Sequence, residues 1–298
     1  MRLKLWFAEL RAPFLLLTPD IVAFGTALAW MEGYFSVQLF ALTLLGATLL
    51  HVATNVLNDY FDYVRGIDLY TRRTPFSGGS GLLPAGLLEP RSVYALGVAS
   101  MIAGMAIGAY LALVVGPWAL VIGAIGALTL YTYTPLLTRY LVGEFATGLN
   151  FGPLMVLGAY YVQTGRLGLH AFLAGVPIGL GTANLLLLNE FPDVEADARG
   201  GRRTLPIVLG KLASAKILAA CYVLAFTSMI ALTLSGVLPE GALLGLLAAL
   251  PASKAIKGAM KYPDDLERLI PHMAANIQAA LMIPFLMTLG IVIQGILF

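Results

Sequence analysis

Charged residues are scarce in this sequence. Asp, Glu, Lys and Arg make up only 11% of the 298 residues, against roughly 25% in a typical soluble domain. So few polar groups could not cover the outside of a water-soluble domain of this size, which excludes a soluble enzyme. The composition also excludes a disordered chain and a fibrous repeat.

Cysteine and net charge are equally limited. The single cysteine, Cys221, excludes a disulfide framework and a cysteine-rich metal site. A net charge of only +2 gives no indication of a nucleic acid partner. The first residues contain no small-residue cleavage site before the long apolar run, so we interpret them as a retained cytosolic segment and not as a signal peptide.

Apolar residues dominate instead. They make up 59% of the sequence, and the mean hydropathy is +0.86. Nine apolar stretches have the length of about 20 residues that a helix needs to cross a ~30 Å hydrocarbon core. They cover residues 13–32, 36–57, 92–114, 117–134, 143–162, 170–188, 213–235, 240–256 and 275–297. We therefore predict an all-α polytopic membrane protein with nine transmembrane helices around a central cavity, capped by cytoplasmic loops.

The Lys and Arg residues indicate the orientation in the membrane. If nine spans alternate in direction, 17 of the 18 Lys and Arg residues lie on the side of the N-terminus, and only Arg166 lies on the other. With a different number of spans, the Lys and Arg residues would be distributed over both sides of the membrane. This division therefore supports nine helices with a cytoplasmic N-terminus and the C-terminus on the opposite side. The two long polar segments, 58–91 and 189–212, are then cytoplasmic.

Acidic residues concentrate at the cytoplasmic ends of the second and sixth predicted helices. Seven of the sixteen lie in two short runs: Asp59, Asp62 and Asp68, then Glu190, Asp193, Glu195 and Asp197. Residues four apart share a helix face, so like charges in these runs repel one another, and burial near the membrane raises the cost. A hard divalent cation with oxygen ligands would relieve this repulsion and leave sites for phosphate. We therefore expect Mg²⁺ that bridges a diphosphate.

The two runs also resemble each other. Asn58 and Asp62 are spaced like Asn189 and Asp193, which follow them by 131 positions, and an Arg-Arg pair follows each run. Arginine binds phosphate oxygens in a bidentate manner. We interpret the chain as one membrane domain, residues 1–298, with two pseudo-related halves, about 1–140 and 141–298. The alternatives are a repeat that arose by chance or by convergence and, for any single residue, a role in capping or anchoring a helix end.

At these residues the sequence resembles the UbiA superfamily of intramembrane prenyltransferases, over nearly its whole length. Residues 58–68, 77–81 and 158–165 resemble the menaquinone branch of that superfamily. One departure is Gly66, where the family pattern has a third acidic residue; here Asp68 follows instead. The resemblance implies that both motifs bind Mg²⁺ and a polyprenyl diphosphate. It implies transfer of the prenyl group to an aromatic acceptor such as 1,4-dihydroxy-2-naphthoate, within the lipid bilayer of the cell membrane.

These considerations assign candidate roles to individual residues. As metal ligands we expect Asp59, Asp62, Asp68, Asn189, Asp193 and Asp197. As diphosphate-binding residues we expect Asn55, Arg11, Arg72, Arg73, Arg202 and Lys211. The candidates for catalysis are Asn58, Asp62, Asp193, Tyr131 and Glu144, and those for the acceptor or the allylic cation are Tyr131, Arg139 and Tyr140. An interfacial aromatic belt is the alternative for the tyrosines, and a favourable charge at a helix N-terminus is the alternative for Glu144.

Other functions fit parts of the pattern. A transporter would have similar hydropathy, but its binding site would lie near the bilayer midplane. A CDP-alcohol phosphotransferase would also use Asp clusters and Mg²⁺, but its Asp-Gly-x2-Ala-Arg run is missing. For a prenyltransferase, 4-hydroxybenzoate and glyceryl phosphate remain alternative acceptors.

Overall fold

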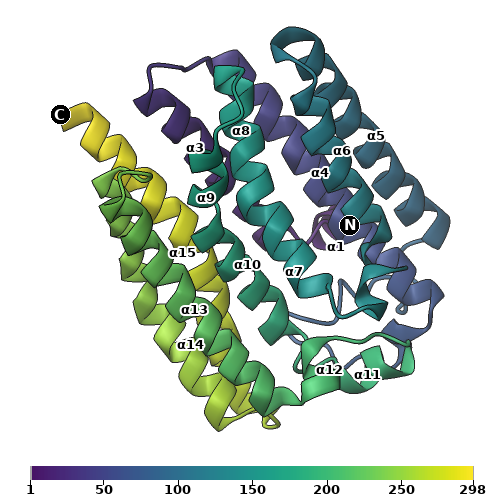
Figure 1. The fold of residues 1–298 in the computed structure, drawn as a ribbon. Coiled ribbons are helices and arrows are strands. Elements are labelled where there is room, and N and C mark those ends of the chain that lie inside the picture. Colours follow the sequence, from purple (N-terminus) through teal and green to yellow (C-terminus); the bar gives the residue numbers. More distant parts are fainter. Residues whose placement is uncertain (1, 298) are drawn as a thin grey trace.

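The computed structural model describes residues 2–297, in which all regular structure is helical (Figure 1). Here α denotes an α-helix and η a 3-10 or π-helical segment. The first part contains α1 (Arg2–Glu9), α2 (Ala12–Leu15), α3 (Leu17–Met31), α4 (Val37–Val64), η1 (Ile67–Leu69), α5 (Pro90–Val115), α6 (Trp118–Tyr133) and η2 (Leu137–Arg139). The second part contains α7 (Gly143–Leu149), η3 (Asn150–Leu154), α8 (Met155–Thr164), α9 (Leu169–Ala174), α10 (Val176–Asn189), α11 (Val194–Arg199), α12 (Leu205–Leu209), α13 (Lys211–Leu234), η4 (Glu240–Ala248), α14 (Ala249–Lys261) and α15 (Leu266–Leu297).

Seven helical stretches of the described chain are long and apolar enough to cross a membrane. They are Ala12–Met31, Val37–Val64, Pro90–Val115, Leu169–Asn189, Lys211–Leu234, Glu240–Lys261 and Leu266–Leu297. The two other predicted spans also fall on helices, but α6 has only 16 residues, and the span at 143–162 is divided among α7, η3 and α8. An all-helical integral membrane protein is therefore confirmed, whereas the number of nine spans stays a prediction.

Helix α4 extends beyond the predicted span. It begins after Ser36, whose side chain accepts a backbone N–H of the first turn, and it has 28 residues. At 1.5 Å per residue it is ~42 Å long, which exceeds a hydrocarbon core of ~30 Å. The helix therefore continues through Asn58 and Asp62 and ends before Gly66, which has a φ of 74° as is common just after a helix. This extra length places the first acidic motif at the end of the bundle.

The π-helical segment η3 interrupts the fifth predicted span. Pro153 lies inside it and has no N–H to donate, and Phe151 departs from helical geometry with φ −85° and ψ 15°. The same segment lies against α10, because a Cβ added to Gly152 would be 2.4 Å from the Cα of Gly179. The bend and this close approach fix where Asn150 and Phe151 face. Single-turn π-helices are often found at functional sites.

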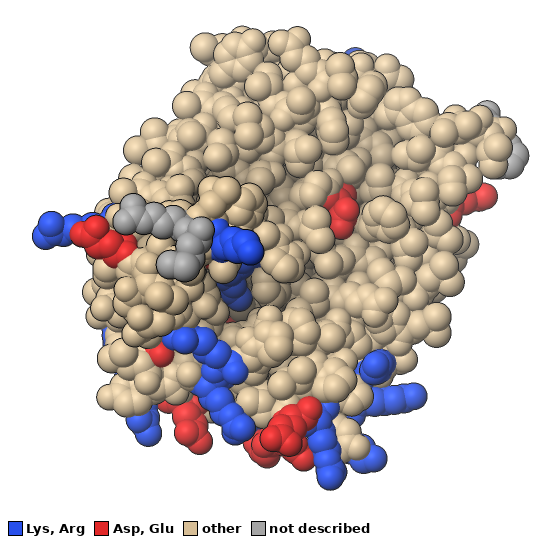
Figure 2. Space-filling model, turned by 180° about the vertical axis from the view of Figure 1, so that it is seen from behind, with Lys and Arg blue, Asp and Glu red and all other residues tan. Residues whose placement is uncertain are grey.

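The polar loops gather at one end of the bundle. Helices α11 and α12 lie at that end, whereas the C-terminal end of α15 lies at the other (Figure 1). Most of the charged side chains visible in Figure 2 lie toward the end with the polar loops, whereas the opposite end is almost entirely uncharged. This one-sided distribution fits a helical bundle in a membrane, with its polar chemistry at one surface.

Three hydrophobic clusters hold the described helices together, of which the smallest includes Leu111 and Tyr161. The largest lies among α3, α8, α10, α13, α14 and α15 and includes Phe24, Ile178 and Tyr222. Another joins α4 and α5 to the N-terminal helices and includes Val56 and Val93. Helices of these clusters line the cavities described next.

Candidate active site

A polar cavity lies at the end of the bundle that carries α11. Residues of both acidic runs line it: Asn55, Asn58, Asp62 and Asp68 from the first, and Asn189, Glu190, Asp193 and Asp197 from the second. Arg11 and Arg202 line the same cavity. The fold therefore brings together two motifs that are 131 positions apart in the sequence.

Arg202 joins the two motifs directly. Its guanidinium donates to Asp62 of the first motif and, at 2.8 Å, to Asp197 of the second. Burial alone would lower the pKa of Arg202, but the two carboxylates raise it above its ordinary value. Arg202 therefore stays cationic. The other oxygen of Asp62 accepts from the Asn58 amide at 3.1 Å, and that amide also donates to Thr134 at 2.9 Å.

The second motif leaves buried oxygens without a partner. Among the side chains of residues 3–297, Asn189 Oδ1 and Asp193 Oδ1 are buried and accept no hydrogen bond. Burial, and then the neighbouring Asp197, raise the pKa of Asp193 to about 8. Burial, and then Asp62 and Asp59, raise the pKa of Asp68 to about 8. Buried oxygens that lack a donor are available to bind a cation.

The oxygen donors of this cavity fit Mg²⁺. No three acidic, His or Cys side chains of the described chain are close enough to hold an ion by themselves. Mg²⁺ does not require such a cluster, because proteins usually bind it through one or two carboxylates together with water and substrate phosphates. The unpartnered oxygens of Asn189 and Asp193 are of this type.

Asp59 faces a glycine-rich loop and does not line the cavity. Its Oδ2 accepts the backbone N–H of Ser80 at 2.7 Å, and the Ser80 hydroxyl donates to Glu9 at 2.7 Å. Gly79 has a φ of 67°, and an added Cβ would lie 3.0 Å from Asp59 Oδ1. Burial and the charge of Asp59 raise the pKa of Glu9 to about 7. The loop and the N-terminal helix α1 are thus fastened to the first motif.

Several other predicted site residues also lie outside the lining of both cavities: Arg72, Arg73, Tyr131, Arg139, Tyr140, Glu144 and Lys211. Tyr140 is 67% exposed, and the Tyr131 hydroxyl lies 3.5 Å from that of Tyr94. Lys211 pairs with Asp264 at 3.1 Å. None of these side chains lines the polar cavity, although Glu144 lies beside Glu190 of the second motif.

Two predicted residues hold the backbone of the site. Glu144 is buried, and its Oε1 accepts the N–H of Leu205 at 2.7 Å, which ties α7 to the start of α12. The Asn55 amide donates at 3.0 Å to the carbonyl of Leu10, next to Arg11. Arg11 has a left-handed φ of 51°, which is uncommon for a residue with a side chain. Asn55 thus fixes the chain beside Arg11.

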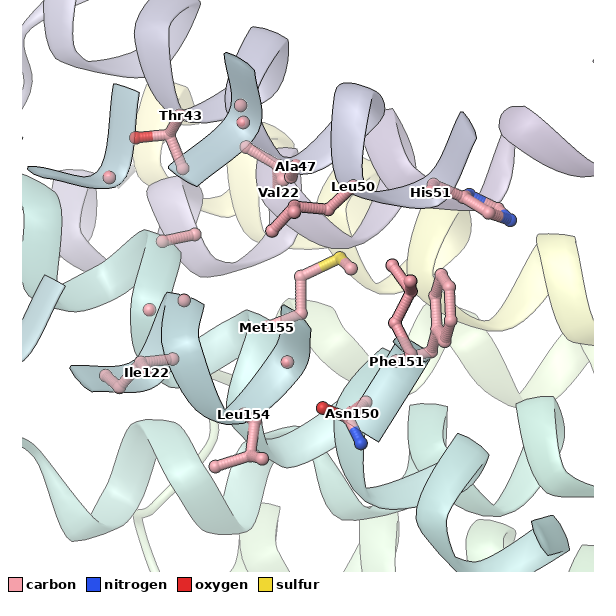
Figure 3. Close-up of a pocket in the computed structure, with 18 of the residues that line it drawn as sticks. Val22, Thr43, Ala47, Leu50, His51, Ile122, Asn150, Phe151, Leu154 and Met155 are labelled. Atoms are coloured by element: carbon pink, nitrogen blue, oxygen red, sulfur yellow. The ribbon is translucent and has the colours of Figure 1, made fainter. Parts of the chain in front are cut away.

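A second, apolar cavity lies deeper in the bundle (Figure 3). Met155 and Phe151 point across it toward Leu50 and His51. Its walls come from α3, α4, α5, α6 and the segment α7–η3–α8. Glycines leave open space along these walls. For example, a Cβ added to Gly108 would meet nothing within 4 Å. Such a cavity suits a flexible hydrocarbon chain.

The two cavities share part of their lining. The shared residues are His51, Thr54, Tyr133, Thr147 and Phe151, and we call this set the junction. One face of α4 runs along both cavities: it includes Thr43, Ala47, Leu50, His51, Thr54, Asn58 and Asp62. Residues spaced by three or four lie on one side of a helix. A single helix face therefore connects the acidic motif with the apolar cavity.

Comparison with known proteins identifies the fold and its activity. Residues 21–268 match the UbiA prenyltransferase family. The chain belongs to this family. It is similar to the 1,4-dihydroxy-2-naphthoate octaprenyltransferase of Bacillus subtilis, with 28% identity over 92% of this chain and 87% of that protein. As a member of the UbiA family with such relatives, the protein is a membrane-embedded prenyltransferase.

Solved structures of UbiA homologs have the same fold. One from Aeropyrum pernix K1 matches with a TM-score of 0.71 and 18% identity, over 94% of this chain and 98% of that chain. Another, from Archaeoglobus fulgidus and bound to GPP and Mg²⁺, matches with a TM-score of 0.57 and 15% identity, over 94% of this chain and 99% of that chain.

The junction of this UbiA prenyltransferase contains residues to which the sequence analysis assigned no role in the site. Tyr133, Thr147 and Phe151 lie in or beside apolar runs, where nothing in the pattern separates a cavity wall from a lipid-facing side. The three-to-four spacing of Thr54 and His51 behind Asn58 on α4 indicates that these two share its face, and His51 is also a candidate because it is an ionisable residue within a predicted span.

Proposed function

We propose that this prenyltransferase moves a polyprenyl group from a polyprenyl diphosphate to an aromatic quinone precursor, with 1,4-dihydroxy-2-naphthoate as the expected acceptor. The observation that carries the proposal is the junction of a charged cavity with an apolar one inside a membrane bundle. A diphosphate needs the first environment, and a hydrocarbon tail needs the second. Similarity to the naphthoate octaprenyltransferases of Bacillus subtilis and Escherichia coli supports the choice of acceptor.

The polar cavity is suited to hold the diphosphate. Arg11 and Arg202 line it and are the cations for the phosphate oxygens. When bound, Mg²⁺ would be held by oxygens of Asp62, Asn189, Asp193 and Asp197 and would supply positive charge against that of the departing diphosphate. Glu144 acts as a positioning residue, because its carboxylate anchors the segment that leads from Arg202 into α12.

The reaction exchanges one bond for another. The allylic C–O bond breaks and its electron pair leaves with the diphosphate, while π electrons of the acceptor ring form the new C–C bond. The ring carbon that forms this bond then loses its original substituent, which is either a proton or a carboxylate that departs as CO2. The apolar lining of the second cavity keeps water from the allylic cation.

We also propose that the N-terminus and both acidic motifs face the cytoplasm. The excess of Lys and Arg on that side supports this orientation.

Purified protein in lipid nanodiscs tests the proposal. Radiolabelled geranylgeranyl diphosphate is offered with Mg²⁺ and with the naphthoate, 4-hydroxybenzoate or glyceryl phosphate in separate reactions. We expect a prenylated naphthoate that forms only with Mg²⁺. If another acceptor is prenylated instead, the proposed acceptor is wrong. If no diphosphate is bound or released with any acceptor, the proposed prenyl transfer fails.

Matched variants separate a specific effect from a general loss of protein. Asp193→Asn removes a carboxylate of the cavity, whereas Asp265→Asn makes the same change on the exposed segment before α15. We expect Mg²⁺-dependent binding of the diphosphate to fall only in the first. Equal binding by both variants would contradict the assigned role of Asp193.

A further inference from the structure

The position of the junction determines where the transferred carbon must lie. In a prenyl diphosphate, the C–O bond that breaks is the boundary between the charged head and the hydrocarbon tail. The charged and the apolar cavity meet only where their linings overlap, at the junction defined above. If the proposed function holds, the acceptor ring has to reach this same place, because it must touch the reacting carbon.

Two hydroxyl groups of the junction have no partner within the described part of the chain. Neither Tyr133 nor Thr147 forms a side-chain hydrogen bond with residues 2–297, and both side chains line the two cavities. In contrast, the hydroxyl of Thr129, one turn away on α6, donates to the carbonyl of Ile125 at 2.8 Å. A hydrocarbon tail offers no hydrogen bond to either free hydroxyl. A second substrate with polar substituents does.

An aromatic pair also lines the junction. The rings of His51 and Phe151 are 4.7 Å apart at an angle of 65°. His51 is held in place by Thr18, whose hydroxyl lies 2.7 Å from Nδ1. Phe151 is held by the bend of η3. Fixed aromatic edges and faces of this kind pack well against another planar ring.

We propose that the junction is the acceptor site of this enzyme and takes a planar, hydroxylated aromatic ring. The hydroxyls of Tyr133 and Thr147 bind the polar substituents of the ring, and Phe151 with His51 packs against its apolar part. This assignment differs from the tyrosines selected from the sequence, since Tyr131 and Tyr140 lie outside both cavities.

The test compares the affinities for the two substrates. Tyr133→Phe and Thr147→Val each remove one hydroxyl and keep the shape of the side chain. In nanodiscs, the KM for 1,4-dihydroxy-2-naphthoate is expected to rise about threefold to tenfold in each variant, as for the loss of one hydrogen bond. The Kd for geranylgeranyl diphosphate, measured by equilibrium dialysis with Mg²⁺, should stay within about twofold, because the diphosphate contacts are assigned to Arg11, Arg202 and Mg²⁺ and not to these two hydroxyls.

The same substitutions elsewhere provide controls. Tyr110→Phe and Thr227→Val lie on α5 and α13, on side chains that line neither cavity. Both should keep the wild-type KM. A third variant, Phe151→Leu, should also raise the KM for the naphthoate, and it serves as an independent test if one hydroxyl variant does not fold.

The outcomes separate the acceptor site from the proposed function. An unchanged KM for the naphthoate in both hydroxyl variants overturns the acceptor site, and so does an equal loss of affinity for both substrates. If the wild-type protein prenylates 4-hydroxybenzoate instead, that compound is the probe and the same comparison applies. A wild-type protein that binds no prenyl diphosphate refutes the proposed function itself, before any variant is compared.

Discussion

Replacement of Arg202 by methionine tests the central contact between the two acidic motifs. The guanidinium donates to Asp62 and Asp197 from a side chain that is only 11% exposed. Methionine has a similar length and no N–H. Removing one partner of a buried ion pair costs about 3–5 kcal/mol, because the remaining charge stays buried. Arg202→Met should lower the free energy of unfolding by about this amount, or the melting temperature by on the order of 10 °C.

The loss of stability should depend on pH. Burial raises the pKa of Asp197 even in the presence of Arg202, whose guanidinium lowers it. Without that guanidinium, the pKa rises further. A carboxyl group with a higher pKa in the folded than in the unfolded protein makes stability fall as the pH rises between the two values. The variant should therefore regain stability toward acidic pH and differ most from the wild type above neutral pH.

Thermal melting in nanodiscs at about pH 5.5 and about pH 8 measures both effects. The control is Arg268→Met, because Arg268 is 69% exposed and pairs with Asp265 at 3.3 Å, so its loss should cost about 0–1 kcal/mol. A second change, Asp197→Asn, should recover part of the stability that Arg202→Met loses. The reasoning is refuted if Arg202→Met and Arg268→Met melt at the same temperature at about pH 8.

Three further predictions concern other parts of the molecule. Asp193→Asn should weaken Mg²⁺-dependent binding of geranylgeranyl diphosphate at least tenfold, or about 1.4 kcal/mol, with an unchanged helical circular dichroism spectrum; retained binding would contradict its place in the site. Because burial and the charge of Asp59 raise the pKa of Glu9 from 4.5 to about 7, its ionisation costs stability as the pH rises between these two values, so Glu9→Gln should flatten the pH dependence of melting in that range. Gly152→Ala should destabilise the fold by about 1–3 kcal/mol, because the added Cβ meets the backbone of α10. Gly108→Ala, where an added Cβ meets nothing, should melt like the wild type, and equal melting of both alanine variants would argue against the close packing.

The architecture and the family were predictable because their signals are local. Long apolar runs identify the membrane helices, and Asn58, Asp62, Asn189 and Asp193 identify the motifs by spacing alone. The structure places these four residues around one cavity. Their roles as metal or catalytic groups stay predictions, as does the division of the chain into two related halves.

The tyrosines show why the rest could not be predicted. Tyr131 and Tyr133 are two residues apart on α6, so they point to nearly opposite sides of the helix. Only Tyr133 lines the cavities. Helix α6 is apolar around its whole circumference, and such a helix gives no indication of which side faces inward.

Loop residues are unpredictable for a different reason. Arg73 follows the first motif in the sequence, as Arg202 follows the second, yet the guanidinium of Arg73 packs against Gly81. Where an arginine in a loop finally points depends on the contacts of that loop with distant segments. Spacing along the chain does not contain this information.

The continuous face of α4 sets a fixed distance between the acidic motif in the polar cavity and the wall of the apolar cavity. From Thr43 to Asp62 it lies along both cavities, a length of ~28 Å. Inserting one residue between Thr54 and Asn58 would turn the carboxylate by ~100° and shift it by ~1.5 Å relative to the apolar wall. In the proposed binding mode, the diphosphate and the prenyl tail would then no longer contact the same face of α4. Changes in preferred prenyl length can therefore arise on the walls opposite α4, where they leave the position of the reacting bond unchanged.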